Sequence, residues 1–221
     1  MSRAPTRLLL LGVTAAVASG CAAPADPVPA APGPVDTSAF VPSRDDPDPS
    51  SRIPGVVVTK HVSTHVTAPE RVDYRQSPPD GGAHDQVWAD CTGVVYPDGL
   101  RTEHAVHSLE HGAVWLTWDP ATADADTVRA ITDRVAGQPY LLASPYPGQP
   151  TTVSVQSWGR QLQLDSATDP RIDQFVTALR QNPSTTPEPG ASCTAPPGLF
   201  DRDDPPPFDG SPVGPGAARQ N

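Results

Sequence analysis

Apolar residues recur every three or four positions in two stretches of the second half of the chain, as they do along one face of an amphipathic helix. The first stretch predicts a helix over residues 124–136, with Asp124 at its acidic start and Gly137 after its end. The second predicts a helix that follows Asp169, because Pro170 suits the first helical position. Each helix is expected to pack one apolar face against a core.

Strands are indicated where β-branched or alternating apolar residues lie between turn residues. Such segments are residues 56–60, 63–66, 113–118, 140–143, 153–155 and 162–164. The last two alternate on either side of Trp158-Gly159, which predicts an antiparallel hairpin. Because helices and strands interleave, we predict a single compact α+β domain with a mixed or antiparallel sheet and about three helices.

The beginning of the chain has the pattern of an export signal. Arg3 and Arg7 precede the apolar run Leu8–Ala18, which is too short to cross a bilayer. The sequence Ala18-Ser-Gly-Cys21 resembles the lipobox of bacterial lipoproteins, which implies cleavage before Cys21 and a lipid anchor on its thiol. An ordinary secretory signal with an incidental cysteine is the alternative. Either reading predicts export, and the lipobox places the protein on the outer face of the cytoplasmic membrane, with the membrane as its partner through Cys21.

Proline-rich segments flank the predicted domain. Residues 21–54 contain nine prolines, and the tail after Cys193 is acidic and rich in proline. Such compositions bury too little apolar surface to fold alone. We therefore expect a signal peptide at 1–20, a lipid-anchored stalk at 21–54, the α+β domain at 55–193 and a disordered tail at 194–221.

Charge and cysteine content restrict the partners and the compartment. The formal net charge of −10 disfavours binding to nucleic acid. With Cys21 assigned to the lipid, Cys91 and Cys193 remain as an even pair, and in an exported protein this favours a disulfide. A thiolate metal ligand at Cys91 is the alternative.

The six histidines of the chain all lie between His61 and His111. We expect a helix over residues 102–111. Five of its polar side chains would lie within one arc of the helix surface: Glu103, His104, His107, Glu110 and His111. His107 and His111 are four residues apart, so neutral imidazoles on adjacent turns can chelate one ion. Thr102 suits the start of this helix and Gly112 its end, and any further ligand must come from elsewhere.

Several motifs resemble an uncharacterised family of bacterial exported or membrane-anchored proteins with a domain of unknown function. The most specific are the loop Pro78-Pro79-Asp-Gly81-Gly82-Ala-His84 and the core Val106-His107-Ser-Leu109-Glu110-His111-Gly112. The resemblance covers about residues 56–193 and implies no activity. Its pattern includes His65, His84, His107, Glu110 and His111, whereas His61 and His104 lie outside it.

The first hypothesis for the histidines is a transition-metal site for Zn(II) or Cu(II), which imidazole-rich sites suit. Its candidate ligands are His107, His111, His84 and His65, with Glu103 and His104 as further candidates. Met1 is the only methionine and would leave with the signal, which argues against a methionine-rich Cu(I) carrier.

Two other hypotheses remain open. The segment His107-Ser-Leu-Glu110-His111 fits the H-x-x-E-H pattern of zinc hydrolases, in which Glu110 would be the general base. Those enzymes need a downstream glutamate ligand, and only Glu188 follows, between prolines that exclude a ligand helix. The sequence therefore disfavours an enzyme. The third hypothesis is a non-catalytic protein that binds an envelope partner and uses its histidines as a structural network.

Overall fold

The computed structural model describes Met1 and residues 35–220 of the 221-residue chain. The expected signal peptide beyond Met1, Cys21 and the first part of the expected stalk lie outside these residues. No helix in the described part is long and apolar enough to cross a membrane.

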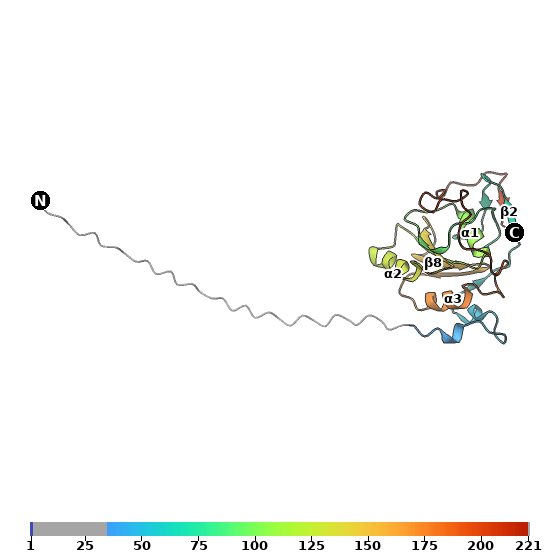
Figure 1. Ribbon diagram of the computed structural model, residues 1–221, viewed down its shortest axis with the longest axis horizontal. Coiled ribbons are helices and arrows are strands. Elements are labelled where there is room, and N and C mark those ends of the chain that lie inside the picture. Colours follow the sequence, from blue (N-terminus) through green and yellow to red (C-terminus); the bar gives the residue numbers. More distant parts are fainter. Residues whose placement is uncertain (2–34, 221) are drawn as a thin grey trace. The chain divides into compact units, whose positions relative to one another are not determined.

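A mixed sheet of six strands forms the centre of the described domain, in the order β1-β9-β8-β6-β7-β5 (Figure 1). The strands are β1 (Val57–Val58), β5 (Thr92–Val95), β6 (Val114–Trp118), β7 (Leu141–Pro145), β8 (Val153–Ser157) and β9 (Arg160–Leu164). β6 pairs parallel with β7 and antiparallel with β8, and β8 and β9 form the predicted antiparallel hairpin. The predicted α+β class and mixed sheet are confirmed.

Three α-helices occur in the described residues, as predicted. They are α1 (Thr102–Glu110), α2 (Ala125–Val135) and α3 (Arg171–Leu179). The Asp124 carboxylate accepts a hydrogen bond from the Thr127 amide and so caps α2. The N-cap residues of α1 and α3 are Arg101 and Pro170, so the expected caps of these two helices differ by one residue.

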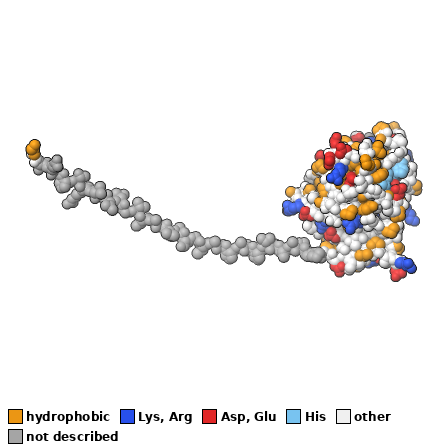
Figure 2. Space-filling model, in the orientation of Figure 1, with side chains coloured by type: hydrophobic (Ala, Val, Ile, Leu, Met, Phe, Trp, Pro, Cys, Tyr) orange, Lys and Arg blue, Asp and Glu red, His pale blue; other side chains and the backbone are white. Residues whose placement is uncertain are grey.

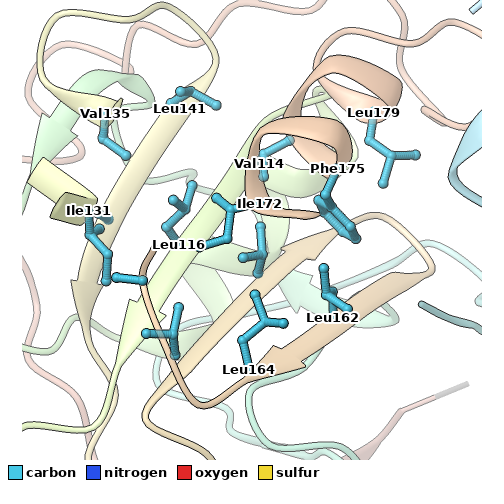
Figure 3. Packing of buried hydrophobic residues seen from close by; sticks show 14 of the residues in the cluster. Val114, Leu116, Ile131, Val135, Leu141, Leu162, Leu164, Ile172, Phe175 and Leu179 are labelled. Atoms are coloured by element: carbon cyan, nitrogen blue, oxygen red, sulfur yellow. The ribbon is translucent and has the colours of Figure 1, made fainter. Parts of the chain in front are cut away.

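Side chains of β6 alternate between two apolar cores on opposite faces of the sheet. Val114 and Leu116 lie in a core shared with α2 and α3 (Figure 3). Trp115, between them, lies in a core shared with Ala105, Val106 and Leu109 of α1. Both faces of β6 are therefore covered, which explains why its sequence reads as a continuous apolar run.

Two small parallel sheets lie outside the central sheet. β2 (Thr64–Val66) pairs with β4 (Ala83–Asp85), and β3 (Val72–Asp73) pairs with β10 (Ala218–Arg219). β4 packs against α1, and Asp85 of β4 forms an ion pair with Arg101 at the start of α1. The expected loop at residues 77–84 thus ends in a short strand that carries His84.

The ordered domain extends further toward the N-terminus than the predicted boundary at residue 55. Residues 38–40 and 49–52 form two 3-10 turns, η1 (Ser38–Phe40) and η2 (Pro49–Arg52). Ile53 is buried in the core on the side of α3. The Asp48 carboxylate accepts a hydrogen bond from Arg160 of β9. The described part of the expected stalk therefore packs on the domain.

The tail after Cys193 also differs from the disordered segment expected. Phe200 is buried in the core on the side of α1, and Pro207 forms a β-bridge with Leu100. The chain then reaches β10, whose partner is β3. Proline-rich composition only predicts that a segment has no core of its own; here the aromatic side chains between the prolines pack on the core of the domain.

Cys91 and Cys193 form the predicted disulfide. The Cys91 amide also donates a hydrogen bond of 3.0 Å to the Cys193 carbonyl. The bridge excludes Cys91 as a thiolate metal ligand. It fixes the segment of residues 185–194, named here the strap, close to the start of β5.

Candidate metal centre

Side chains from three elements converge beside α1. His65 comes from β2, His84 from β4, and His107 and Glu110 from α1. One ligand atom of each lies within 4.8 Å of the others, so this group, named here the inner cluster, could hold a metal ion. His84, His107 and Glu110 are buried, whereas the His65 side chain is 43% exposed. Histidine side chains reach the surface on the side of the domain where β2 lies (Figure 2).

Backbone carbonyls orient the buried imidazole rings. His84 Nδ1 lies 2.8 Å from the Gly82 carbonyl, and His107 Nδ1 lies 2.6 Å from the Asp85 carbonyl. A carbonyl only accepts, so each Nδ1 carries a hydrogen, and in the neutral ring Nε2 keeps a lone pair. Histidine ligands of metals are usually held in this way. Gly82, with a φ of 103°, adopts a backbone conformation that strongly favours glycine.

Glu110 Oε2 lies among the three imidazoles of the inner cluster. It is 2.8 Å from His84 Nε2 and 3.9 Å from the Nε2 atoms of His65 and His107. Despite the short distance, His84 Nε2 and Glu110 Oε2 are buried without a well-formed hydrogen bond to any described residue. Two buried acceptor atoms face each other favourably only when a proton or a cation lies between them.

Burial and neighbouring charges set the protonation of the cluster. Burial, together with the charges of the nearby His84 and His111, lowers the pKa of His107 to about 3. Burial alone would raise the pKa of Glu110, but the polar contacts of His84 and Ser63 and the charges of nearby histidines outweigh it and lower that pKa to about 2. At neutral pH the cluster therefore offers a neutral His107 and an anionic Glu110.

A second group of ligand atoms adjoins the inner cluster. Atoms of His107, His111 and Glu188 also lie within 4.8 Å of one another. His111 Nε2 is 3.4 Å from Glu188 Oε2, and His111 Nδ1 is 2.7 Å from the Ser192 carbonyl. Burial lowers the pKa of His111. Glu188 lies in the strap, outside any helix, as its flanking prolines require, and yet it reaches the second histidine of α1.

Glu103 and His104 belong to neither group of ligand atoms. The Glu103 carboxylate accepts a hydrogen bond from the Val72 amide and pairs with Arg101. His104 Nδ1 donates to the Val87 carbonyl at 2.7 Å, and its ring packs against Phe200. Both side chains therefore have structural contacts at the start of α1, and the structure does not bring them to His107.

Trp88 covers one side of the histidines. Its ring centroid lies 5.3 Å from that of His107 and 4.7 Å from that of His111. The indole Nε1 donates to the Thr194 carbonyl of the strap. The indole thus limits the access of water to both rings, which strengthens the electrostatic interactions between them and a cation.

Comparison with known proteins identifies the family of this chain. The model of a family described as a protein of unknown function (DUF3105) matches residues 65–195, which include all members of the two candidate ligand groups and both bridged cysteines. No curated protein and no solved structure matches the chain significantly. The chain therefore belongs to the DUF3105 family.

Proposed function

We propose that this domain binds one transition-metal ion, Zn(II) or Cu(II), through the inner cluster. The ligands are Nε2 of His65, His84 and His107 together with the Glu110 carboxylate. The observation that carries the proposal is the convergence of ligand atoms from three histidines and Glu110, with the buried His84 Nε2 and Glu110 Oε2 only 2.8 Å apart. A cation placed among these atoms would satisfy both.

The donor set favours a transition metal over Ca²⁺ or Mg²⁺. Three imidazole nitrogens and one carboxylate oxygen suit Zn(II) and Cu(II), whereas Ca²⁺ and Mg²⁺ require mostly oxygen ligands. The neutral state of His107 at neutral pH leaves its lone pair free for a metal. The bound ion would supply Lewis acidity and a fixed positive charge inside the cluster.

The position of Glu110 supports binding over hydrolysis. A general base must stand beside the metal-bound water with its carboxylate free of the metal. Glu110 Oε2 instead lies 2.8 to 3.9 Å from the three imidazole nitrogens, close enough to share one ion with them as a ligand atom. His65, the exposed ligand, is the one that solvent or a partner molecule could replace.

The test is elemental analysis and metal titration of the full chain, purified without a histidine tag, beside His84→Gln and His104→Gln variants. We expect about one equivalent of zinc or copper in the wild type, and a loss of affinity of about 100-fold or more in His84→Gln. His104→Gln is the matched control, since it removes a buried histidine outside the cluster, and it should keep the ion. A folded wild type that takes up no stoichiometric metal at micromolar concentrations would refute the proposal.

We also propose that the protein works outside the cytoplasm, anchored through a lipid on Cys21. The Cys91–Cys193 disulfide supports an oxidising compartment. Fractionation of cells that produce the wild type or Cys21→Ser tests the anchor. The wild type should sediment with membranes and carry a lipid by mass spectrometry, and the variant should not. A wild type released without lipid would contradict the proposal.

A further inference from the structure

The two ligand groups share one atom. His107 belongs to both the inner cluster and the group with His111 and Glu188. Because His107 Nδ1 donates to the Asp85 carbonyl, only its Nε2 can bind a metal. A single nitrogen lone pair binds one ion at a time, so the two groups compete for His107.

The outer group is exposed mainly at Glu188, and the inner cluster mainly at His65. The Glu188 side chain is 49% exposed, His111 and His107 are 4% and 5% exposed, and His84 is fully buried. The ring centroids of His111 and His107 are 4.6 Å apart, and those of His107 and His84 are 4.7 Å apart. Ligand atoms therefore continue without a break from the surface to the inner cluster.

The outermost ligand is held in place by the strap. The Glu188 amide donates a hydrogen bond of 3.2 Å to the Glu110 carbonyl, at the end of α1. Four residues further on, the Ser192 carbonyl accepts from His111 Nδ1. The Cys91–Cys193 disulfide fixes the strap directly beyond this contact. Glu188 is thus positioned by its backbone and is not merely a free surface carboxylate.

Charge disfavours simultaneous occupation of both groups. Two divalent cations repel each other four times as strongly as two unit charges at the same separation. Glu110 and Glu188 are the only carboxylates in the two groups, and His107 is shared. One ion would therefore occupy one group or the other.

We propose that His107, His111 and Glu188 form an outer metal position through which an ion enters and leaves the inner cluster. The ion first binds Glu188 and His111, takes His107 as a third ligand, and then exchanges the two outer ligands for His65, His84 and Glu110. His107 and His111 offer lone pairs without releasing protons, and the metal keeps its oxidation state throughout. This inference rests on the metal site proposed above.

The experiment is stopped-flow loading of the full, metal-free chain with Co(II), followed by removal of the ion with a chelator. Three proteins are compared: the wild type, Glu188→Gln and Asp133→Asn. Asp133 is the matched control, because it is an exposed acid on α2, on the opposite face of the sheet. We expect Glu188→Gln to slow loading and removal by about tenfold or more, since a charged residue at an entrance raises the local concentration of the incoming ion. The equilibrium stoichiometry should stay at one ion, and the affinity should stay within about threefold of the wild type.

Other results would overturn the proposal. Equal rates in Glu188→Gln and the wild type would refute the outer position while leaving the inner site intact, and would point to entry at His65. Two Co(II) ions per wild-type chain at saturation would show that the groups fill together. Loss of the equilibrium ion in Glu188→Gln would make Glu188 a permanent ligand. A wild type that binds no Co(II) or Zn(II) would refute the inner site as well, so the two failures are distinguishable.

Discussion

α1 and α3 are both nine-residue helices that pack on the same sheet, from opposite faces, but only α1 buries charged and polar side chains beside its apolar ones. α3 buries only apolar residues, namely Ile172, Phe175, Ala178 and Leu179. α1 buries almost its whole length, including two glutamates and two histidines. Burial of a polar group without a partner destabilises a fold by about 1 to 3 kcal/mol, so stability alone does not explain the composition of α1. The face with α3 stabilises the domain, and the face with α1 holds the candidate site.

The largest expected effect is on the α3 side. Phe175→Ala should lower the free energy of unfolding by about 3 to 5 kcal/mol, because it removes a fully buried ring and leaves a cavity. Urea denaturation measures the loss, with the half-buried Gln174→Ala as control on the same helix. The metal affinity of the folded variant should equal that of the wild type. A large fall in affinity would mean that the two faces are not independent.

The second largest expected effect comes from removal of the disulfide, which lies on the α1 side of the sheet. The double variant Cys91→Ser/Cys193→Ser should lose about 2 to 4 kcal/mol of unfolding free energy, because the bridge closes a long loop of the unfolded chain. Hydrogen exchange should show the opening to be greatest in the strap, where the Ser192 carbonyl contacts His111. Uniformly faster exchange, with α3 as affected as the strap, would contradict this separation of the two faces.

The third expected effect distinguishes a metal site from a structural histidine network. Metal at about 100 times its dissociation constant should raise the unfolding free energy of the wild type by about 2.7 kcal/mol. Glu110→Gln should show little of this gain at the same metal concentration, while its metal-free form is at least as stable as the wild type, because the amide can donate to His84 Nε2. Thermal or urea unfolding with and without Zn(II) measures both.

Glu103→Gln is the control for that comparison. It weakens the contacts with Arg101 and Val72 and should destabilise the protein equally with and without metal, while keeping the full response to metal. A structural network would instead make Glu110→Gln unstable under both conditions, which would overturn the metal interpretation.

The accuracy of the sequence-based predictions differs between the regular elements of the domain and its two ends. The apolar periodicity of α2, β6 and the hairpin of β8 and β9 is local, and these elements appear where the pattern predicts them. The tail and the described part of the stalk were predicted to be unstructured, because composition does not reveal that Phe200 or Ile53 packs on a distant surface. Local pattern therefore identifies the elements of the domain better than its boundaries.

The sequence also predicts one part of the candidate site and not another. The spacing of His107 and His111 identified the helix, and the resemblance brought in His65 and His84. The sequence places Glu110 on the same arc as His107 and His111, but it assigns to Glu110 the role of a general base and not that of a metal ligand. The position of Glu188 beside α1 depends on the path of the strap, which no local pattern specifies. One arc of a helix can face two different neighbours: Glu103 and His104, which the sequence offers as further candidates beside His107, contact Val72, Arg101 and Val87 in the structure.

The smallest expected effect is a pH dependence confined to the α1 side. The pKa of His107 is lowered to about 3 in the folded protein, and burial also lowers the pKa values of His104 and His111. Below the ordinary histidine pKa the unfolded chain takes up protons that the folded metal-free protein does not, so stability is complete above about pH 6.5 and falls as the pH drops toward 3. Glu110, whose pKa is lowered to about 2, adds to the loss only below about pH 4.5.

Between about pH 7.5 and pH 6, each of these histidines should lower the metal-free unfolding free energy by about 1 kcal/mol or less. Urea denaturation in the presence of a chelator measures this slope. His107→Gln should reduce the slope by the contribution of one histidine. Phe175→Ala, on the other face, should lower the unfolding free energy at both pH values and leave the slope unchanged. If His107→Gln keeps the full slope, His107 takes up a proton in the folded metal-free protein over the same pH range as in the unfolded chain. The proton would then occupy the place proposed for the ion, and acidification would release the metal by direct competition at Nε2.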